Sequence, residues 1–193
     1  MLKDFMIKER DAITQMIEEC STQYDDILNL FANCKGKLAF MGVGKSAHIG
    51  EKLAATFASL GIPSFFVHST EAMHGDLGMI EPRDIAVLIS NGGNTQEVVQ
   101  NIEPLKRNGV TTVAFISGKD SKLANGCEHI LLYPKINEAD NLNLAPTVSS
   151  TLTLVLGDAI ACELSSRKNF KREVFYKYHP NVALGAMLAK ENK

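Results

Sequence analysis

Five short apolar segments alternate with helical stretches along most of this 193-residue chain. The apolar segments are residues 37–42, 63–67, 85–90, 111–116 and 129–133. Apolar residues at helical spacing separate most of them, near 46–60, 95–108 and 120–126. Strands that alternate with helices at this spacing form a parallel sheet between two helical layers. The pattern therefore predicts an α/β fold.

The two ends of the chain extend this core with further helical patterns. Apolar positions between residues 2 and 33 predict one or two helices, and a long helical pattern runs from about 147 to 166. We see no linker and no repeat, and the length suits one domain. We expect a single domain over 1–193, with N-terminal helices (about 2–33), an α/β core (about 37–166) and a C-terminal tail (about 168–193).

Composition narrows the class of protein. The chain is 45% hydrophobic and 22% charged, and its net charge of −2 favours neither nucleic acid nor an anionic membrane as a partner. We find no apolar run of membrane-span length, and the charged N-terminus does not resemble a signal peptide. Four scattered cysteines are therefore expected to be reduced core thiols of a cytoplasmic protein: Cys20, Cys34, Cys127 and Cys162.

The first predicted strand leads into a glycine turn, Gly42-Val43-Gly44, and then into a helix that opens with Lys45 and Ser46. Backbone N–H groups, a helix N-terminus, a cation and a hydroxyl then meet at one point. This combination favours an anion, most often a phosphate.

Two known phosphate motifs fit this segment poorly. A P-loop needs a glycine where Ala39 stands. A dinucleotide fingerprint matches Gly42, Gly44 and Ala47, but no acid ends the next strand before Glu71, so we do not favour NAD. A tight strand-to-helix turn without a ligand remains an alternative.

Polar residues also follow the third predicted strand, in Ser90-Asn91-Gly92-Gly93-Asn94-Thr95-Gln96-Glu97. A glycine turn bordered by hydroxyls at a helix start is a second candidate anion site. Asn94 and Glu97 also fit a capping box, so the sequence leaves capping and catalysis open for Glu97.

The fifth and second strands are followed by further polar groups. Glu138 precedes Pro146, Thr147 and Ser149, which predict a third polar helix N-terminus, although hydroxyls there often serve as caps. After the second strand come His68 and His74, whose spacing matches no standard zinc site. We interpret His74 as a substrate or acid–base contact.

Four stretches together resemble the sugar isomerase (SIS) family, and within it the arabinose 5-phosphate isomerase branch. They are GVGKSAHIGEKLAATFASLGIPSFFVHSTEAMHGDLGMI, ISNGGNTQE, LAPTVSSTLTLVLGDA and HPNVALG. The resemblance implies a flavodoxin-like three-layer α/β/α sandwich with a five-stranded parallel sheet. It also implies an aldose–ketose isomerase that interconverts D-ribulose 5-phosphate and D-arabinose 5-phosphate, for synthesis of Kdo and surface polysaccharides.

The resemblance further implies which residues act. The family's catalytic positions fall on Lys45, Glu97, Glu138 and His179. Substrate contacts are expected at Ser46, Gly61, Ile62, His74, Ser90, Asn91, Thr95, Thr147 and Ser149. His68 matches a position associated with inhibitory zinc. The reaction requires no cofactor and no metal.

The chain departs from the family pattern at two loops. Gly92 stands where the family usually has serine, and Asn181 and Val182 replace two glycines after the His-Pro pair. Longer relatives carry a CBS module, so this chain looks like a stand-alone form. Relatives assemble with sites at subunit boundaries, so we expect a homotetramer in which His179 serves a neighbour's site and the N-terminal helices form an interface.

Isomerisation moves a proton between adjacent carbons through an enediol, which calls for a base and for stabilisation of an oxyanion. Glu138 and Glu97 are both suitable bases, and the sequence does not choose between them. His179 is suited to ring opening or proton transfer, and Lys45 to binding phosphate or polarising the carbonyl. Two alternatives stay open: an isomerase of another sugar phosphate, and a non-catalytic sugar-phosphate regulator.

Overall fold

The protein contains a five-stranded parallel sheet in the order β2-β1-β3-β4-β5. The computed structural model describes residues 1–20 and 22–179. The strands are β1 (Leu38–Gly42), β2 (Ser64–His68), β3 (Ile85–Ile89), β4 (Thr111–Ile116) and β5 (His129–Leu132). Each begins and ends within about one residue of its predicted bounds. The flavodoxin-like strand order confirms the predicted fold.

Both faces of the central strands are buried, which explains why they are continuously apolar. All five residues of β1 and all five of β3 are buried. Neighbouring side chains enter opposite cores: Phe40 packs into one hydrophobic cluster and Met41 into the other. This is the pattern expected of a parallel sheet covered on two sides.

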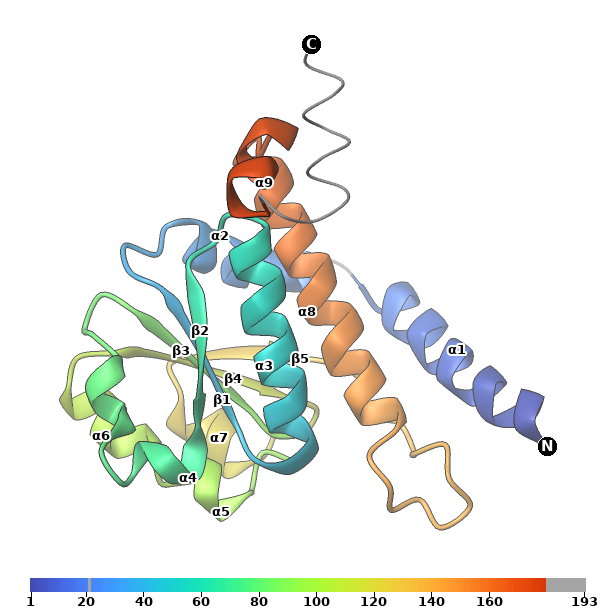
Figure 1. Ribbon diagram of the computed structural model, residues 1–193. Coiled ribbons are helices and arrows are strands. Elements are labelled where there is room, and N and C mark those ends of the chain that lie inside the picture. Colours follow the sequence, from blue (N-terminus) through green and yellow to red (C-terminus); the bar gives the residue numbers. More distant parts are fainter. Residues whose placement is uncertain (21, 180–193) are drawn as a thin grey trace.

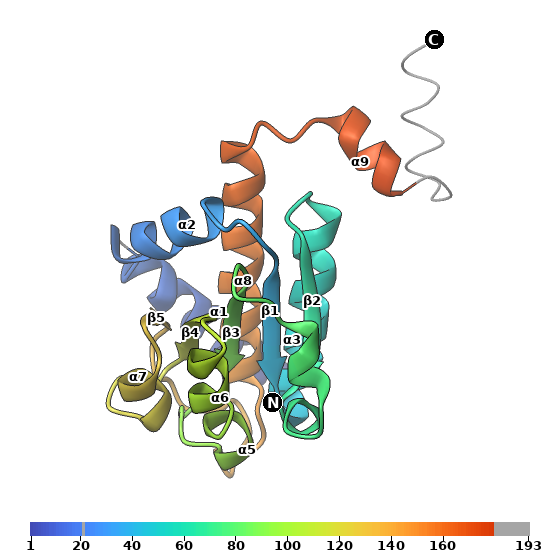
Figure 2. The ribbon, with the colours of Figure 1, turned by 90° about the vertical axis from the view of Figure 1, so that its left-hand side faces the viewer.

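Helices cover the two faces unequally (Figures 1 and 2). One face carries the long helices α1 (Leu2–Glu18), α2 (Asp25–Ala32), α3 (Gly44–Ser59) and α8 (Val148–Arg167). A 3-10 turn, Thr22–Tyr24, precedes α2. The other face carries shorter helices: α4 (Ser69–Ala72), α5 (Gln96–Val99), α6 (Ile102–Arg107) and α7 (Lys122–Gly126), with a 3-10 turn at Asp76–Met79.

The predicted helix over 95–108 is wrong in one respect, because it is two short helices. Pro104 has no N–H to donate to the carbonyl of Gln100, so a continuous helix would lose a hydrogen bond there. Asn101, at the break, is fully buried and its Nδ2 donates to the carbonyl oxygens of Ser69 (3.0 Å) and Glu97 (2.8 Å). Asn101 therefore connects the break after α5 to the start of α4, directly after β2.

Helix α8 corrects the expectation that no apolar run reaches membrane-span length. By length and composition alone, its 20 residues are apolar enough to cross a membrane. Half of its most apolar stretch is buried inside the protein, and the helix packs against α3 and α1. We therefore interpret α8 as the core helix of this layer.

Two further expectations need correction. The cysteines are not core thiols: Cys20 and Cys162 are exposed, and Cys34 and Cys127 are half-buried. The tail from Lys168 was not predicted to be helical, yet it contains α9 (Arg172–Tyr178). Residues 180–193, including the replaced glycine positions Asn181 and Val182, lie outside the described part.

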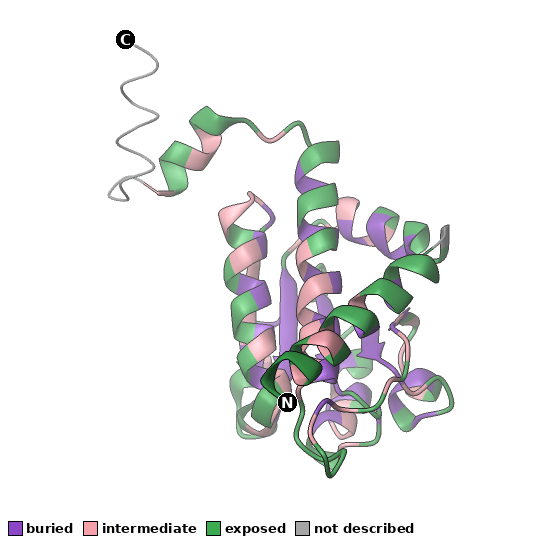
Figure 3. Cartoon of the chain, turned by 90° about the vertical axis from the view of Figure 1, so that its right-hand side faces the viewer, coloured by how far each residue is buried: buried purple, intermediate pink, exposed green. Residues whose placement is uncertain are grey.

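Helix α1 is the most exposed of the long helices (Figure 3). Only Ala12 and Met16 of this helix are buried. The large apolar side chains of Met6 and Ile17 are 66% and 63% exposed. An apolar surface of this kind on a long helix suits contact with another protein surface.

Candidate active site

The carboxyl ends of the strands surround a cavity of about 200 Å³. Residues that follow β1 and β3 line most of it, together with Tyr133 after β5 and the first turns of α8. The lining residues are Val43, Lys45, Ser46, Ile49, Ile89, Ser90, Asn91, Gly92, Thr95, Tyr133, Pro146, Ser149, Ser150 and Thr153. In a sheet of this order the chain reverses direction between β1 and β3, which is where such folds bind ligands.

The turn from β1 to α3 places Lys45 and Ser46 at this cavity. Gly44 has a φ of +56°, a left-handed conformation that glycine adopts without strain, and it starts α3 directly after the strand. Lys45 is exposed and makes no ion pair with any residue that the structure describes. The turn thus presents an unpaired cation and a helix N-terminus to the cavity.

The loop after β3 contributes two hydroxyls that contact each other. Ser90 Oγ lies 2.9 Å from Thr95 Oγ1, and Ser90 is buried. Gly93 has a φ of +69°, and a Cβ there would collide with the Ser121 side chain, so the loop needs glycine at this position. The paired hydroxyls are suited to bind oxygen atoms of an anion at the start of α5.

The capping box at Asn94 and Glu97 does not form. Helix α5 begins after Thr95, without a side-chain cap, and Asn94 Oδ1 instead accepts a hydrogen bond from the Lys122 N–H (2.9 Å). Glu97 is exposed, and its carboxylate accepts no hydrogen bond from a described residue. Since Glu97 does not serve as a cap, its side chain is free to contact a ligand.

The side chain of Asn91 is fixed by two hydroxyls at the cavity wall. Its Oδ1 accepts hydrogen bonds from Ser117 Oγ (2.7 Å) and from the Tyr133 hydroxyl (3.1 Å). Desolvation by burial raises the pKa of Tyr133 to about 12, so the phenol stays a donor at neutral pH. With Oδ1 occupied, the Asn91 amide N–H groups are left for a ligand.

Glu138 lies beside the cavity, at the N-terminus of α8. Its Oε2 accepts hydrogen bonds from the Thr147 N–H (2.8 Å), the Thr147 hydroxyl (3.2 Å) and the Ser149 N–H (3.1 Å). A carboxylate here is favoured by the positive end of the helix dipole. The other oxygen, Oε1, accepts no hydrogen bond in the described part of the chain. The prediction that the Thr147 side chain caps α8 is therefore wrong, because the Glu138 carboxylate accepts the hydrogen bonds of the N–H groups at the helix N-terminus.

Several predicted residues approach the cavity without lining it. Glu138 lines a separate hollow of about 510 Å³ between α1 and the segment 137–143, and it meets the cavity only through Ser149. Thr147 lies at the same junction. Glu97 follows the cavity-lining Thr95 by two residues, in the first turn of α5, and does not line the cavity itself. Within one chain, therefore, the cavity gathers the lysine and the hydroxyls, and neither carboxylate lines it.

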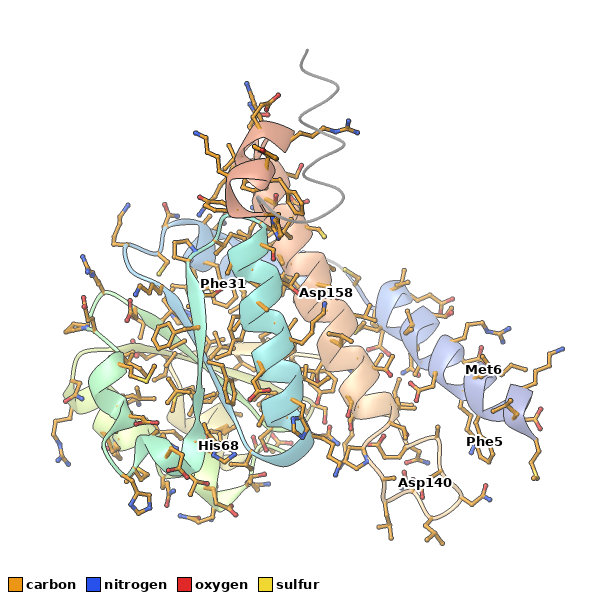
Figure 4. All side chains as sticks on the ribbon, viewed as in Figure 1. Phe5, Met6, Phe31, His68, Asp140 and Asp158 are labelled. Atoms are coloured by element: carbon orange, nitrogen blue, oxygen red, sulfur yellow. The ribbon has the colours of Figure 1, made fainter. Side chains whose placement is uncertain are left out.

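The histidines after β2 lie further along the same edge. His74 is exposed, and it does not line the cavity. His68 ends β2 (Figure 4), and its buried Nδ1 has no hydrogen-bond partner within residues 1–20 and 22–179. Among the described residues, no group of three potential metal ligands surrounds it. The inhibitory zinc contact at His68 stays a prediction.

Three predicted site residues lie at the opposite end of the sheet from the cavity, so they do not join it within one chain. Gly61 and Ile62 follow α3, and His179 follows α9; His179 Nε2 lies 3.3 Å from Ser59 Oγ at the end of α3. Ser59 follows Lys45 by fourteen positions in α3, which is roughly 21 Å along the helix axis. Figure 1 shows α9 at the top, far from the strand ends at the bottom.

Tyr133 is a site residue that the sequence analysis missed. It was counted within the fifth strand, but β5 ends at Leu132, so Tyr133 is the first residue beyond the strand. A residue directly after a strand lies on the ligand-binding edge of the sheet, and this position could have identified Tyr133. Ser150 and Thr153 were also missed, because they lie inside α8, in its first and second turns, where only packing shows their direction.

A doubly wound sheet with a cavity lined by Lys45 and hydroxyls, placed where the chain reverses direction, is the arrangement of an α/β ligand-binding protein. The chain belongs to the SIS domain family, whose model matches residues 30–162.

Curated relatives and a solved structure agree with this family. The chain is 45% identical to the arabinose 5-phosphate isomerase KpsF of Escherichia coli over 168 residues, covering 87% of this chain and 53% of the relative. It is 43% identical to KdsD of Pseudomonas aeruginosa, covering 93% and 55%. The chain thus spans about half the length of these relatives. The structure of E. coli CFT073 c3406 in complex with arabinose 5-phosphate is 46% identical, with a TM-score of 0.91 over 93% of this chain and 95% of that chain.

Proposed function

We propose that the protein is an arabinose 5-phosphate isomerase that interconverts D-ribulose 5-phosphate and D-arabinose 5-phosphate. One observation carries this proposal: the cavity gathers Lys45 with the hydroxyls of Ser90 and Thr95 between the N-termini of α3 and α8. The similarity to KpsF, to KdsD and to c3406 with its bound arabinose 5-phosphate supports this choice of sugar phosphate.

The phosphate binds where backbone N–H groups and hydroxyls converge. Ser90 and Thr95 hold phosphate oxygens, and the N-terminus of α3 adds its N–H groups and dipole. Lys45 contributes a charge that no described residue neutralises. Ser46, Ser149 and the Asn91 amide face the remaining volume, where they bind sugar hydroxyls.

The reaction removes a proton from one carbon and returns it to the next. From the ketose, a carboxylate takes a proton from C1, the carbonyl oxygen at C2 gains a proton, and an enediol forms. The C1 hydroxyl then loses its proton as C2 receives one, which gives the aldose. Glu138 suits the base, because three donors hold its Oε2 and no described residue donates to its Oε1. Glu97, whose carboxylate accepts no hydrogen bond from a described residue, suits a contact to a sugar hydroxyl.

The site is completed by another copy of the chain. His179, Gly61 and Ile62 lie together about 21 Å from Lys45, too far to reach the same substrate. In a homotetramer with sites at subunit boundaries, this end of one copy meets the cavity of the next, and His179 assists ring opening. The exposed apolar side chains of α1, Met6 and Ile17, contribute to the interface. Gel filtration that shows a fully active monomer at low concentration would contradict this assembly.

The aldose product serves synthesis of Kdo for surface polysaccharides, and the reaction takes place in the cytoplasm. No cofactor and no metal takes part in the scheme, and nucleic acid and membranes are not partners.

The test is to incubate the protein with D-ribulose 5-phosphate in deuterium oxide and to analyse the product by NMR. We expect D-arabinose 5-phosphate with deuterium at C2. Turnover only of a hexulose, heptose or amino-sugar phosphate would assign a different isomerase. Binding of sugar phosphates without turnover would instead indicate a regulator.

A further inference from the structure

The segment from Asn137 to Thr147 connects β5 to α8 and carries Glu138, yet it contains no helix or strand. Its middle is exposed: Leu142 and Leu144 are each 75% accessible, so burial of apolar side chains does not hold it. Figure 4 shows Asp140 on this segment, and Asp140 shares a hollow with Lys8 and Gln15 from the middle of α1. Side-chain hydrogen bonds to the backbone must therefore define its shape.

Asp140 makes most of these hydrogen bonds. Its Oδ1 accepts from the N–H groups of Leu144 (2.9 Å) and Ala145 (2.9 Å), and its Oδ2 accepts from the Leu142 N–H (3.0 Å). Its carbonyl oxygen also accepts from the Asn143 N–H (3.1 Å). One residue thus closes the stretch from 140 to 145 into a compact turn.

The turn brings Asn143 back to the backbone of Glu138. Asn143 has a φ of +56°, a left-handed conformation that asparagine tolerates better than most residues. Its Oδ1 accepts a hydrogen bond from the Glu138 N–H (2.6 Å). Without the turn, Asn143 would not face Glu138, because five residues separate them along an irregular chain.

The peptide after Glu138 is held from the other side. The Ala139 N–H donates to Thr147 Oγ1 (2.8 Å), and Lys8 Nζ of α1 donates to the Ala139 carbonyl oxygen (2.9 Å). Thr147 Oγ1 in turn donates to Glu138 Oε2. The backbone around Glu138 is therefore clamped between Asn143 and Thr147, and its carboxylate is set against α8.

We propose that Asp140 is a positioning residue for the isomerase reaction: it folds the 140–145 turn that holds Glu138 at the N-terminus of α8 beside the cavity. This inference rests on the proposed function, because it assigns the base role to Glu138. Asp140 itself does not line the cavity, so it acts only through Glu138.

The first test compares Asp140→Ala, Asp140→Asn and the control Asp26→Ala in steady-state kinetics with D-ribulose 5-phosphate. Asp26 is an exposed carboxylate in the first turn of α2, with no hydrogen bond to a described residue. In Asp140→Ala we expect kcat to fall roughly 10- to 100-fold with little change in KM, because a misplaced base slows the proton transfer.

Asp140→Asn should recover most of the kcat that Asp140→Ala loses. The asparagine oxygen can still accept from Leu144 and Ala145, so only the bond from Leu142 is lost. Asp26→Ala should keep the wild-type kcat. A kcat within about twofold of wild type in Asp140→Ala would overturn the proposal.

A double variant separates positioning from general destabilisation. In a Glu138→Gln background the base is already disabled, so Asp140→Ala should cause no further loss of kcat. Loss of the same factor in both backgrounds would show that Asp140 acts independently of Glu138 and would overturn the proposal.

Hydrogen exchange tests the positioning without using activity. The Thr147 and Ser149 amides donate to Glu138, so Asp140→Ala should speed their exchange about fivefold relative to amides in the centre of α8. Unchanged exchange at both amides would overturn the positioning role. If wild-type protein fails to isomerise ribulose 5-phosphate while exchange responds as expected, the proposed function fails and the structural part of the inference stands.

Discussion

Glu138 and Glu97 both follow strands at the same edge of the sheet, but the segments that carry them are held in different ways. Glu138 lies in an irregular segment whose backbone and carboxylate are bonded to Asn143, Thr147 and Ser149. Glu97 lies in a regular helix, yet its carboxylate is exposed and contacts no described donor. Regular secondary structure therefore does not decide which side chain is held in place.

This difference in hydrogen bonding suits Glu138 and Glu97 to two different tasks within one site. A base must be oriented before the substrate arrives, because reorganisation during proton transfer adds to the barrier. A free carboxylate instead adapts to a hydroxyl of the bound sugar. The predictions below test this division between Glu138 and Glu97, in order of expected effect.

Glu138→Gln should cause the largest loss, with kcat lower by about 10²- to 10⁴-fold, because an amide cannot accept the proton. The fold should stay intact, since the glutamine carbonyl can still accept from the Thr147 and Ser149 N–H groups. Steady-state kinetics and thermal unfolding measure the two effects. Wild-type turnover in this variant would exclude Glu138 as the base.

Glu97→Gln should lower kcat/KM by about tenfold, which corresponds to the loss of one charge-assisted hydrogen bond. The same kinetic assay measures this change. A loss larger than that of Glu138→Gln would reverse the assignment of the two carboxylates. Near-wild-type turnover in both variants would reject the carboxylate-base hypothesis altogether.

Tyr133→Phe tests the loop on the Glu97 side. The substitution removes the phenolic hydroxyl and leaves Ser117 as the remaining side-chain donor to Asn91 Oδ1. The Asn91 amide should then be less well oriented for the sugar. We expect KM to rise about fivefold with kcat nearly unchanged. Ser166→Ala, at an exposed position on α8, is a control. A fall in kcat without a change in KM would contradict a role in binding.

Lowering the pH should destabilise the turn that holds Glu138 before it affects the segment that carries Glu97. Desolvation acts to raise the pKa of Asp140, but hydrogen bonds from Ala145, Leu144 and Leu142 outweigh it and hold the pKa below its ordinary value. The turn is therefore fully stabilised above the ordinary carboxyl pKa of about 4, and the stabilisation is lost as pH falls through the lower folded value.

Hydrogen exchange at the Leu144 and Ala145 amides, corrected for intrinsic rates, measures this acid effect. Protection should be constant from neutral pH down to about 5 and should fall below about 4. Amides of α5 should show no matching change. Loss of protection near neutral pH would assign the turn to another group.

Most of the fold could be predicted, because strand and helix periodicity is a local property. The strands β1 and β3 were recognised from continuous apolar runs, and α3 and α8 from helical spacing and the preceding Gly44 and Pro146. The break between α5 and α6 was not predicted, because apolar residues at helical spacing continue across Pro104 and the burial of Asn101 is a tertiary property.

The sequence by itself determined the parallel sheet, the glycine turn before Lys45 and the gathering of Lys45, Ser90, Thr95 and Ser149 at one edge, because strand direction brings these loop residues together. Only the tertiary structure decided that Glu138 caps α8 within a turn closed by Asp140, and that His179, Gly61 and Ile62 lie at the far end of α3. Those placements depend on hydrogen bonds and packing between residues that local periodicity does not connect.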